Sequence, residues 1–210
     1  MPRSPEETRS LFDEWALTYD DCVRQPCGPL EGYEHSLKEA AAMVPVEAGA
    51  LLLDIGIGTG AFSAVFAQRG ARVCGIDVSG QMLAKCHLNH PEFSLAEGSF
   101  ESIPYPDEQF DVVVSSFSFH EVPPAARGAA CAEAMRVLKP KGYVCLLDVM
   151  FASPEAVADA RQVIGCYWDD DEDYPLVGDL DALLRLSGLC GVRWRQTAPW
   201  HWAVVGRRLT

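Results

Sequence analysis

Basic residues are scarce in this sequence. It contains 17 Lys and Arg against 30 Asp and Glu, which gives a formal net charge of −13. Because a protein that binds a polyanion normally presents a basic face, this imbalance argues against a nucleic-acid partner. No apolar stretch approaches the ~18 residues of a membrane span, and the first residues lack the apolar segment of a signal peptide. We therefore expect a cytoplasmic protein with no membrane partner.

Paired metal-binding motifs are also missing. The eight cysteines are scattered, with no C-x-x-C pair and no accompanying histidine set. Cys22 and Cys27 form a lone C-x4-C, which is a weak indication of a metal. We expect mostly buried, reduced thiols that behave as small apolar side chains, and no bound metal.

The length and apolar content indicate one globular domain. A chain of 210 residues with 49% apolar residues can bury a sizeable core. We expect a single domain spanning residues 1–210, as a monomer or homodimer. Within it, residues 1–48 would form a helical lid, 49–150 a cofactor-binding core, and 151–210 C-terminal helices with an antiparallel hairpin.

Strand and helix patterns alternate through the middle of the chain. Near-continuous apolar runs indicate strands covered on both faces, and the helical segments between them predict a parallel α/β sheet. The expected parallel strands are Ala50–Ile55, Arg72–Ile76, Phe93–Ala96, Phe110–Phe117 and Tyr143–Val149. Two further strands, Gly191–Gln196 and Trp200–Arg207, are separated by only a few residues. That spacing predicts an antiparallel pair.

A glycine-rich stretch after the first strand is the strongest local motif. An apolar run ends at Asp54, and Gly56, Gly58 and Gly60 follow at alternate positions before a helix. Such a turn lets a ligand lie against bare backbone near a helix N-terminus.

Two ligands compete for this turn. Gly56-x-Gly58-x-x-Ala61, with Asp77 about 20 residues further on, fits the dinucleotide pattern, which favours a nicotinamide-dependent oxidoreductase. Against this, Asp54 lies beside the glycines and would repel a pyrophosphate. S-adenosyl-L-methionine carries no phosphate and has a cationic end, which Asp54 can attract directly or through water. Asp77 can accept both ribose hydroxyls of either ligand.

Several motifs in the correct order resemble those of class I S-adenosylmethionine-dependent methyltransferases. They are Asp54-x-Gly56-x-Gly58-x-Gly60, the acid Asp77 ending the second strand, Phe110-Asp111-Val112-Val113, and Arg136-Val137-Leu138-Lys139-Pro140-Lys141-Gly142. The match covers roughly residues 50 to 148. It implies a Rossmann-like fold with a seven-stranded, mostly parallel sheet in the order 3-2-1-4-5-7-6. The flanks, Trp15-Ala-x-x-Tyr19-Asp20 and Ser115-Ser116-Phe-Ser-Phe-His120, resemble small bacterial methyltransferases of methionine-to-cysteine recycling loci.

The resemblance implies a set of cofactor contacts. The glycines would admit the methionine part of the cofactor, and Tyr19 would reach its carboxylate from the lid. Ser99 stands where the family usually has an Asp that accepts the adenine amino group, so recognition there would depend on a hydroxyl or backbone atoms. The remaining implied contacts are Val78, Met82 and Phe100 around the adenine, and the Ser115 backbone.

His120 is the candidate general base, because it follows the fourth strand and would face the transferred methyl group. A histidine at this position can equally pack or hydrogen-bond locally. The acidic segment Asp169 to Asp173 could attract a cationic substrate or a divalent metal, or be a solvated loop. The predicted function is transfer of a methyl group from S-adenosyl-L-methionine to a small-molecule acceptor. The alternatives are the oxidoreductase and a non-catalytic S-adenosylmethionine-binding protein.

Overall fold

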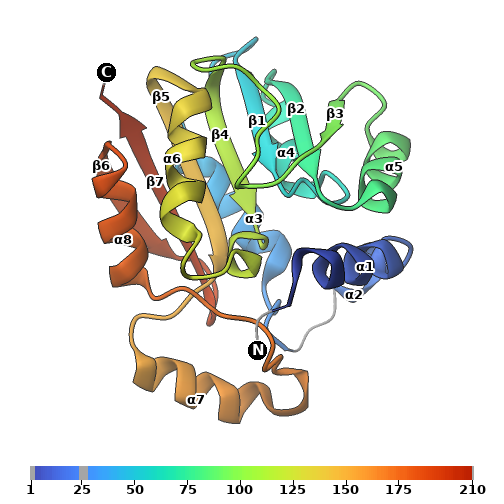
Figure 1. Cartoon of the computed structure of the whole chain (residues 1–210), viewed down its shortest axis with the longest axis vertical. Helices are drawn as coiled ribbons and strands as arrows, with labels where there is room; N and C mark the ends of the chain where they lie inside the picture. Colours follow the sequence, from blue (N-terminus) through green and yellow to red (C-terminus); the bar gives the residue numbers. More distant parts are fainter. Residues whose placement is uncertain (1–2, 24–27, 210) are drawn as a thin grey trace.

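The computed structural model describes residues 3–23 and 28–209. A single seven-stranded sheet has the order β3-β2-β1-β4-β5-β7-β6, which confirms the predicted topology (Figure 1). The strands are β1 (Leu51–Ile55), β2 (Arg72–Asp77), β3 (Ser94–Glu97), β4 (Phe110–Ser116), β5 (Leu138–Val149), β6 (Leu189–Gln196) and β7 (His201–Arg208). β1 to β5 run parallel, and β7 is antiparallel to both β5 and β6.

Helices cover both faces of the sheet. The α-helices are α1 (Pro5–Trp15), α2 (Tyr19–Cys22), α3 (Tyr33–Ala42), α4 (Ala61–Ala67), α5 (Gly80–Asn89), α6 (Arg127–Val137), α7 (Pro154–Ile164) and α8 (Val177–Leu186), with 3-10 turns η1 (Phe119–Glu121) and η2 (Gly165–Tyr167). Side chains of α3, α4 and α5 join one buried cluster, and those of α6 and α8 join a second cluster on the opposite face. This arrangement leaves the carboxyl ends of the central strands open to the lid side.

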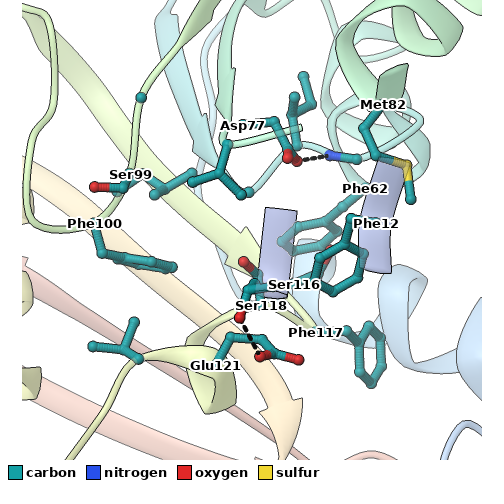
Figure 2. Close-up of a pocket in the computed structure, with 18 of the residues that line it drawn as sticks. Phe12, Phe62, Asp77, Met82, Ser99, Phe100, Ser116, Phe117, Ser118 and Glu121 are labelled. Carbon is teal, nitrogen blue, oxygen red and sulfur yellow. Dashed lines mark hydrogen bonds between the residues drawn. The ribbon is translucent and has the colours of Figure 1, made fainter. Parts of the chain in front are cut away.

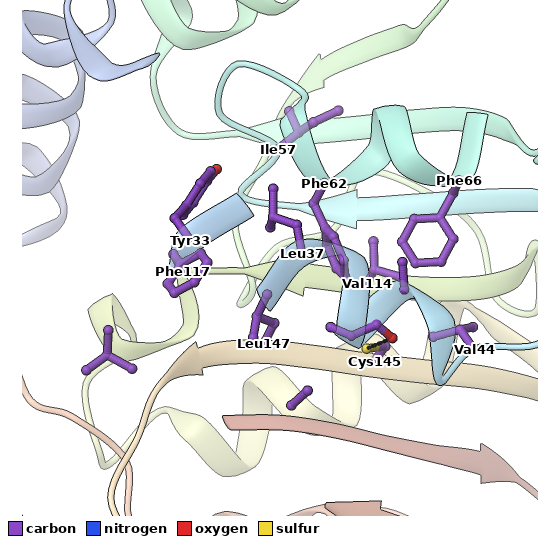
Figure 3. Close-up of a cluster of buried hydrophobic side chains, with 14 of the residues drawn as sticks. Tyr33, Leu37, Val44, Ile57, Phe62, Phe66, Val114, Phe117, Cys145 and Leu147 are labelled. Atoms are coloured by element: carbon purple, nitrogen blue, oxygen red, sulfur yellow. Dashed lines mark hydrogen bonds between the residues drawn. The ribbon is translucent and has the colours of Figure 1, made fainter. Parts of the chain in front are cut away.

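The N-terminal segment is divided differently from the prediction. Residues 1–48 were expected to form a helical lid. In the structure α1 ends at Trp15 and a turn precedes α2. α3 does not stand over the sheet edge. Its Leu37, and Val44 just beyond it, pack beside Phe66 and Leu147 in the core (Figure 3). α1, which packs against α5, and α2 are called the lid helices below.

The start of β5 also differs. Residues 139–142 were expected to be a turn before a strand from Tyr143, whereas β5 begins at Leu138. The register against β4 shifts between Phe110 and Val112, and Lys141 has a φ of 68°. A bulge thus absorbs the extra residues inside the strand. Gly142 is required there, because an added Cβ would lie 2.8 Å from the Asp111 carbonyl oxygen.

The described thiols are divided between core and surface. Cys74, Cys86, Cys131 and Cys145 are buried and unpaired, whereas Cys22 and Cys166 are exposed and Cys190 is half-buried. Cys27 lies outside the described residues, so the C-x4-C pair cannot be placed. Among residues 3–23 and 28–209, none of the helices combines the length and apolar character that crossing a bilayer requires.

Candidate active site

A pocket lies at the carboxyl ends of β1, β2 and β4, beneath the lid helices (Figure 2). About 1090 Å³ within it is free of protein atoms, part of it open to solvent. The walls include Arg3, Thr8, Phe12, Tyr19, Tyr33, Gly56, Gly58, Asp77, Val78, Met82, Ser99, Phe100, Ser116, Phe117, Ser118 and Glu121.

The glycine loop uses its own N–H groups inside the protein. The amides of Gly56 and Ile57 both donate to the Ile76 carbonyl, at 2.8 and 2.9 Å, and Gly60 donates to the Ile57 carbonyl. Gly58 donates to the Asp77 carboxylate at 2.9 Å. A pyrophosphate cradle needs free backbone donors. These four amides are already engaged, which fits a ligand without phosphates.

Each glycine of the motif has a separate structural reason. All three have positive φ, 71° at Gly56, 54° at Gly58 and 91° at Gly60, a region that favours glycine. A Cβ on Gly56 would meet Ser118, and one on Gly60 would lie 2.6 Å from the His90 ring. A Cβ on Gly58 would meet no protein atom and would occupy pocket space. Gly56 and Gly58 line the pocket, but Gly60 does not. Gly60 is therefore needed for the start of α4 and for the close approach of the His90 ring. It does not line the pocket, where a ligand contact was expected.

Asp77 is held rigidly at the end of β2. One carboxylate oxygen accepts from the Ser79 amide at 2.9 Å and the other from Gly58. The side chain is 7% exposed, and burial raises its pKa, an effect that the backbone hydrogen bonds from Ser79 and Gly58 oppose. Each oxygen has further lone pairs, so the carboxylate can accept hydroxyl hydrogens from a ligand in the pocket.

Asp54 is not at the mouth of the loop, where it was expected. Its side chain is buried, and one carboxylate oxygen accepts from the Ser63 hydroxyl at 2.7 Å. Burial raises its pKa to about 7, with the Ser63 hydrogen bond opposing the shift. Its other oxygen has no hydrogen-bond partner among the described residues. The side chain does not line the pocket, so of the two predicted ways to attract a ligand's cation, directly or through water, the one through water stays a prediction.

The residues that were expected around an adenine all line this pocket. Val78 and Met82 line the pocket from the start of α5, and Ser99 and Phe100 line it from the loop after β3. The edge-to-face contact of Phe100 with Phe119, with ring centroids 5.2 Å apart, holds its ring in place. Phe12 and Phe100 lie on opposite sides of the space in Figure 2.

Ser115 is the exception among the β4 residues. Its side chain is 1% exposed, its hydroxyl lacks a hydrogen-bond partner among the described residues, and it does not line the pocket. The next residue, Ser116, does so instead, because successive strand residues point to opposite faces. The predicted contact was with the Ser115 backbone, and Ser115 does not line the pocket.

Polar contacts that the sequence did not reveal join the lid helices to the glycine loop after β1 and to the start of α5. The Asp13 carboxylate of α1 accepts from the Ser79 hydroxyl at 2.6 Å and from the Gln81 amide at 3.3 Å, at the N-terminus of α5. Asp20 accepts from the Thr59 hydroxyl at 2.7 Å. Tyr19 lines the pocket as expected. No local pattern links Asp13 to Ser79, which is 66 positions away.

His120 is buried behind the pocket and does not line it. Its Nδ1 donates to the Asp148 carboxylate at 2.5 Å, and its backbone amide donates to the other oxygen of the same carboxylate. Burial alone would lower its pKa, but the charges of Asp148 and Glu172 outweigh burial and raise the pKa to about 10. A general base has to accept a proton near neutral pH, so this imidazolium does not suit the predicted role.

The fold and pocket together define a Rossmann-like protein that binds a phosphate-free nucleoside cofactor. Residues 53–146 match the family model described as a methyltransferase domain. An uncharacterized methyltransferase from Alkaliphilus oremlandii is 33% identical over 178 residues, covering 82% of this chain and 79% of that protein. A demethylmenaquinone methyltransferase from Chlorobaculum parvum is 33% identical, covering 70% of this chain and 62% of that protein.

Solved structures agree with this fold. An S-adenosylmethionine-dependent methyltransferase from Aquifex aeolicus has a TM-score of 0.71 at 17% identity, covering 92% of this chain and 98% of that chain. The chain belongs to the S-adenosylmethionine-dependent methyltransferase family. Its cofactor is S-adenosyl-L-methionine.

Proposed function

We propose that the chain methylates a small-molecule acceptor inside the pocket under the lid helices. The observation that carries this proposal is the cover that the lid helices form over part of the pocket. Asp13 and Asp20 fasten α1 and α2 to the cofactor loops, and Phe12 and Tyr19 from these helices form part of the wall. A small molecule fits beneath such a cover, whereas a folded macromolecule would have to displace it.

The cofactor contacts are proposed residue by residue. Asp77 accepts the ribose hydroxyls, while Val78, Met82, Phe100 and Ser99 surround the adenine. Gly56 and Gly58 admit the methionine part, and Tyr19 reaches its carboxylate. Asp54 and Gly60 shape the loop from behind. The cofactor supplies an activated methyl group on a sulfonium, so the protein's main task is to position the acceptor.

The other end of the pocket provides the acceptor site. Figure 2 shows Phe12 and Phe117 there, beside Ser118 and Glu121. The rings of Phe117 and Tyr33 pack with centroids 5.0 Å apart. These walls favour an acceptor with an apolar, planar body and one polar group. The Chlorobaculum parvum relative is named for demethylmenaquinone, whose ring system has this character.

The acceptor class, the domain organisation and the role of His120 complete the proposal. The net charge of −13 disfavours a nucleic-acid acceptor. We propose one domain for the whole chain, active as a monomer or homodimer. We assign no proton transfer to His120, since its Nδ1 is bonded to Asp148 and its side chain lies outside the pocket wall.

Two measurements test the proposal. Calorimetric titration should show binding of S-adenosylhomocysteine and none of NADH. Production of S-adenosylhomocysteine is then followed with quinols, phenols, thiols, amines and RNA as acceptors. We expect turnover with one of the small molecules. Phe12→Ala should raise the acceptor KM, whereas Leu17→Ala, at a position that is 84% exposed in the turn between the lid helices, should not.

Two results would overturn the proposal. Turnover with RNA alone would replace the small-molecule acceptor by a macromolecule. Tight S-adenosylhomocysteine binding without turnover on any acceptor would favour the non-catalytic binding protein.

A further inference from the structure

Three side chains with metal-binding atoms converge at one edge of the pocket. His120 and Glu121 belong to η1, directly after β4, and Glu172 belongs to the acidic segment between η2 and α8. The Nε2 atom of His120 lies 3.8 Å from a carboxylate oxygen of Glu121 and 3.7 Å from one of Glu172. The three donor atoms lie within 4.8 Å of one another. Sequence distance hides this cluster, because Glu172 joins it only through the fold.

The Asp148 carboxylate orients the His120 ring. A carboxylate can only accept, so the 2.5 Å contact with Asp148 fixes the proton on Nδ1 and turns Nε2 toward the two glutamates. Asp148 is fully buried, and the backbone amides of His120 and Val149 hold it at 3.0 and 2.7 Å. A histidine that ligates a metal typically donates its other ring N–H to a carboxylate in this way.

A buried hydroxyl beside the cluster also lacks a partner. Tyr174 is 8% exposed, and its hydroxyl makes no hydrogen bond of acceptable geometry with the described residues. Its ring centroid lies 5.8 Å from that of His120. A metal-bound water or a metal-ligating carboxylate would give this hydroxyl a partner.

We propose that His120, Glu121 and Glu172 form a binding site for a divalent transition metal ion of the Zn²⁺ or Mn²⁺ type. One imidazole and two carboxylates suit such ions. Ligands at about 2.1 Å from a tetrahedral centre lie about 3.4 Å apart, so the observed separations need only small side-chain movements. Binding replaces the proton on Nε2. Three protein ligands leave a coordination position open.

Arg3 pairs with the same two carboxylates, those of Glu121 and Glu172, when no metal is bound. One guanidinium nitrogen lies 3.4 Å from the Glu121 oxygen and 3.9 Å from the Glu172 oxygen, and another pairs with Asp169. A guanidinium and a dication cannot share these oxygens without strong repulsion. Arg3 therefore competes with a metal ion for these carboxylates. Replacing Arg3 should strengthen metal binding if the cluster is a metal site, and should produce no metal binding if the cluster is only an internal group of ion pairs.

The site also has a chemical use. Glu121 lines the pocket, so an ion bound to it would lie at the edge where the acceptor enters. There it can bind an oxygen or sulfur atom of the acceptor and lower that atom's pKa. This use rests on the proposed function, whereas the metal site itself does not.

The test uses the full chain, stripped with chelator and free of cofactor and acceptor. Isothermal titration with ZnCl2 and with MnCl2 should show one ion bound per chain for at least one metal. Glu172→Gln and His120→Asn should each weaken that binding by at least about tenfold. Asp170→Asn removes a charge from the same segment, where Asp170 pairs with Arg161 at 2.7 Å, and should bind as the parent does. Arg3→Gln should bind more tightly.

Absence of binding in both the parent and Arg3→Gln overturns the proposal, as does Glu172→Gln binding with parental affinity. Glu172 lies in a loop and its side chain is 14% exposed, so its substitution keeps the test valid if His120→Asn, at a more buried position, fails to fold. Because neither cofactor nor acceptor is present, failure of metal binding is distinguishable from failure of methyl transfer, which is read from S-adenosylhomocysteine production.

Discussion

The buried carboxylate of Asp54 should make the protein less stable as pH rises. Its folded-state pKa is raised from 3.8 to about 7 by burial. Between these values the folded protein keeps a proton that the unfolded chain has released. Stability is thus greatest below the unfolded pKa and falls until the pH passes the folded pKa. Applying this linkage to one group, the loss between about pH 5.5 and about pH 8.5 is about 2 kcal/mol.

Asp54→Asn removes this titration while keeping the size of the side chain. The amide has its own cost, because one of its atoms faces the site where the Asp54 oxygen lacks a partner. That cost does not change with pH, so it cancels when the pH dependences of the parent and the variant are compared. The variant should lose about 2 kcal/mol less than the parent over the same range, since the other titrating groups are shared.

Urea unfolding of the cofactor-free protein, followed by circular dichroism at several pH values, measures the effect. Asp107→Asn is the matched control, because Asp107 is 73% exposed and its removal should leave the pH dependence parallel to the parent's. Parallel curves for the parent and Asp54→Asn would refute the reasoning. They would show that the Asp54 carboxyl does not titrate in this range in the folded protein.

Three further substitutions test the pocket and its cover. Asp77→Asn should weaken S-adenosylhomocysteine binding by about 1–3 kcal/mol in calorimetry, because charged hydrogen bonds are lost. Glu97→Gln, on the exposed neighbouring strand, should leave the affinity unchanged. Unchanged affinity in Asp77→Asn would remove the proposed ribose role. Gly60→Ala should destabilise the folded protein by about 1–3 kcal/mol more than Gly49→Ala in urea unfolding. Both glycines have positive φ, but of the two only Gly60 faces a side chain. Equal losses of stability would mean that the His90 contact is unimportant. Asp13→Ala should speed proteolysis of α1 and raise the S-adenosylhomocysteine Kd, and an unchanged rate would show that the Ser79 contact does not hold the lid helices.

Short-range patterns were sufficient for the sheet and for part of the site. Apolar runs of strand length, with helical segments between them, predicted every strand to within a few residues, except that β5 starts earlier at a bulge. The alternate glycines and the acid at the end of β2 predicted the pocket position, because a positive φ and a strand-end carboxylate are local properties. Such features depend on neighbours in sequence, which makes them readable there.

The direction of individual side chains depended on tertiary packing. Asp54 and Ser115 belong to the right strands, yet both side chains are buried away from the pocket, since strand twist and the opposing helix decide which face is covered. The sequence by itself determined the fold and the place of the pocket-lining residues Gly56, Gly58 and Asp77. Only the tertiary structure brought Asp13 to Ser79 and Glu172 to His120, because contacts between distant segments depend on how the elements pack and not on local pattern.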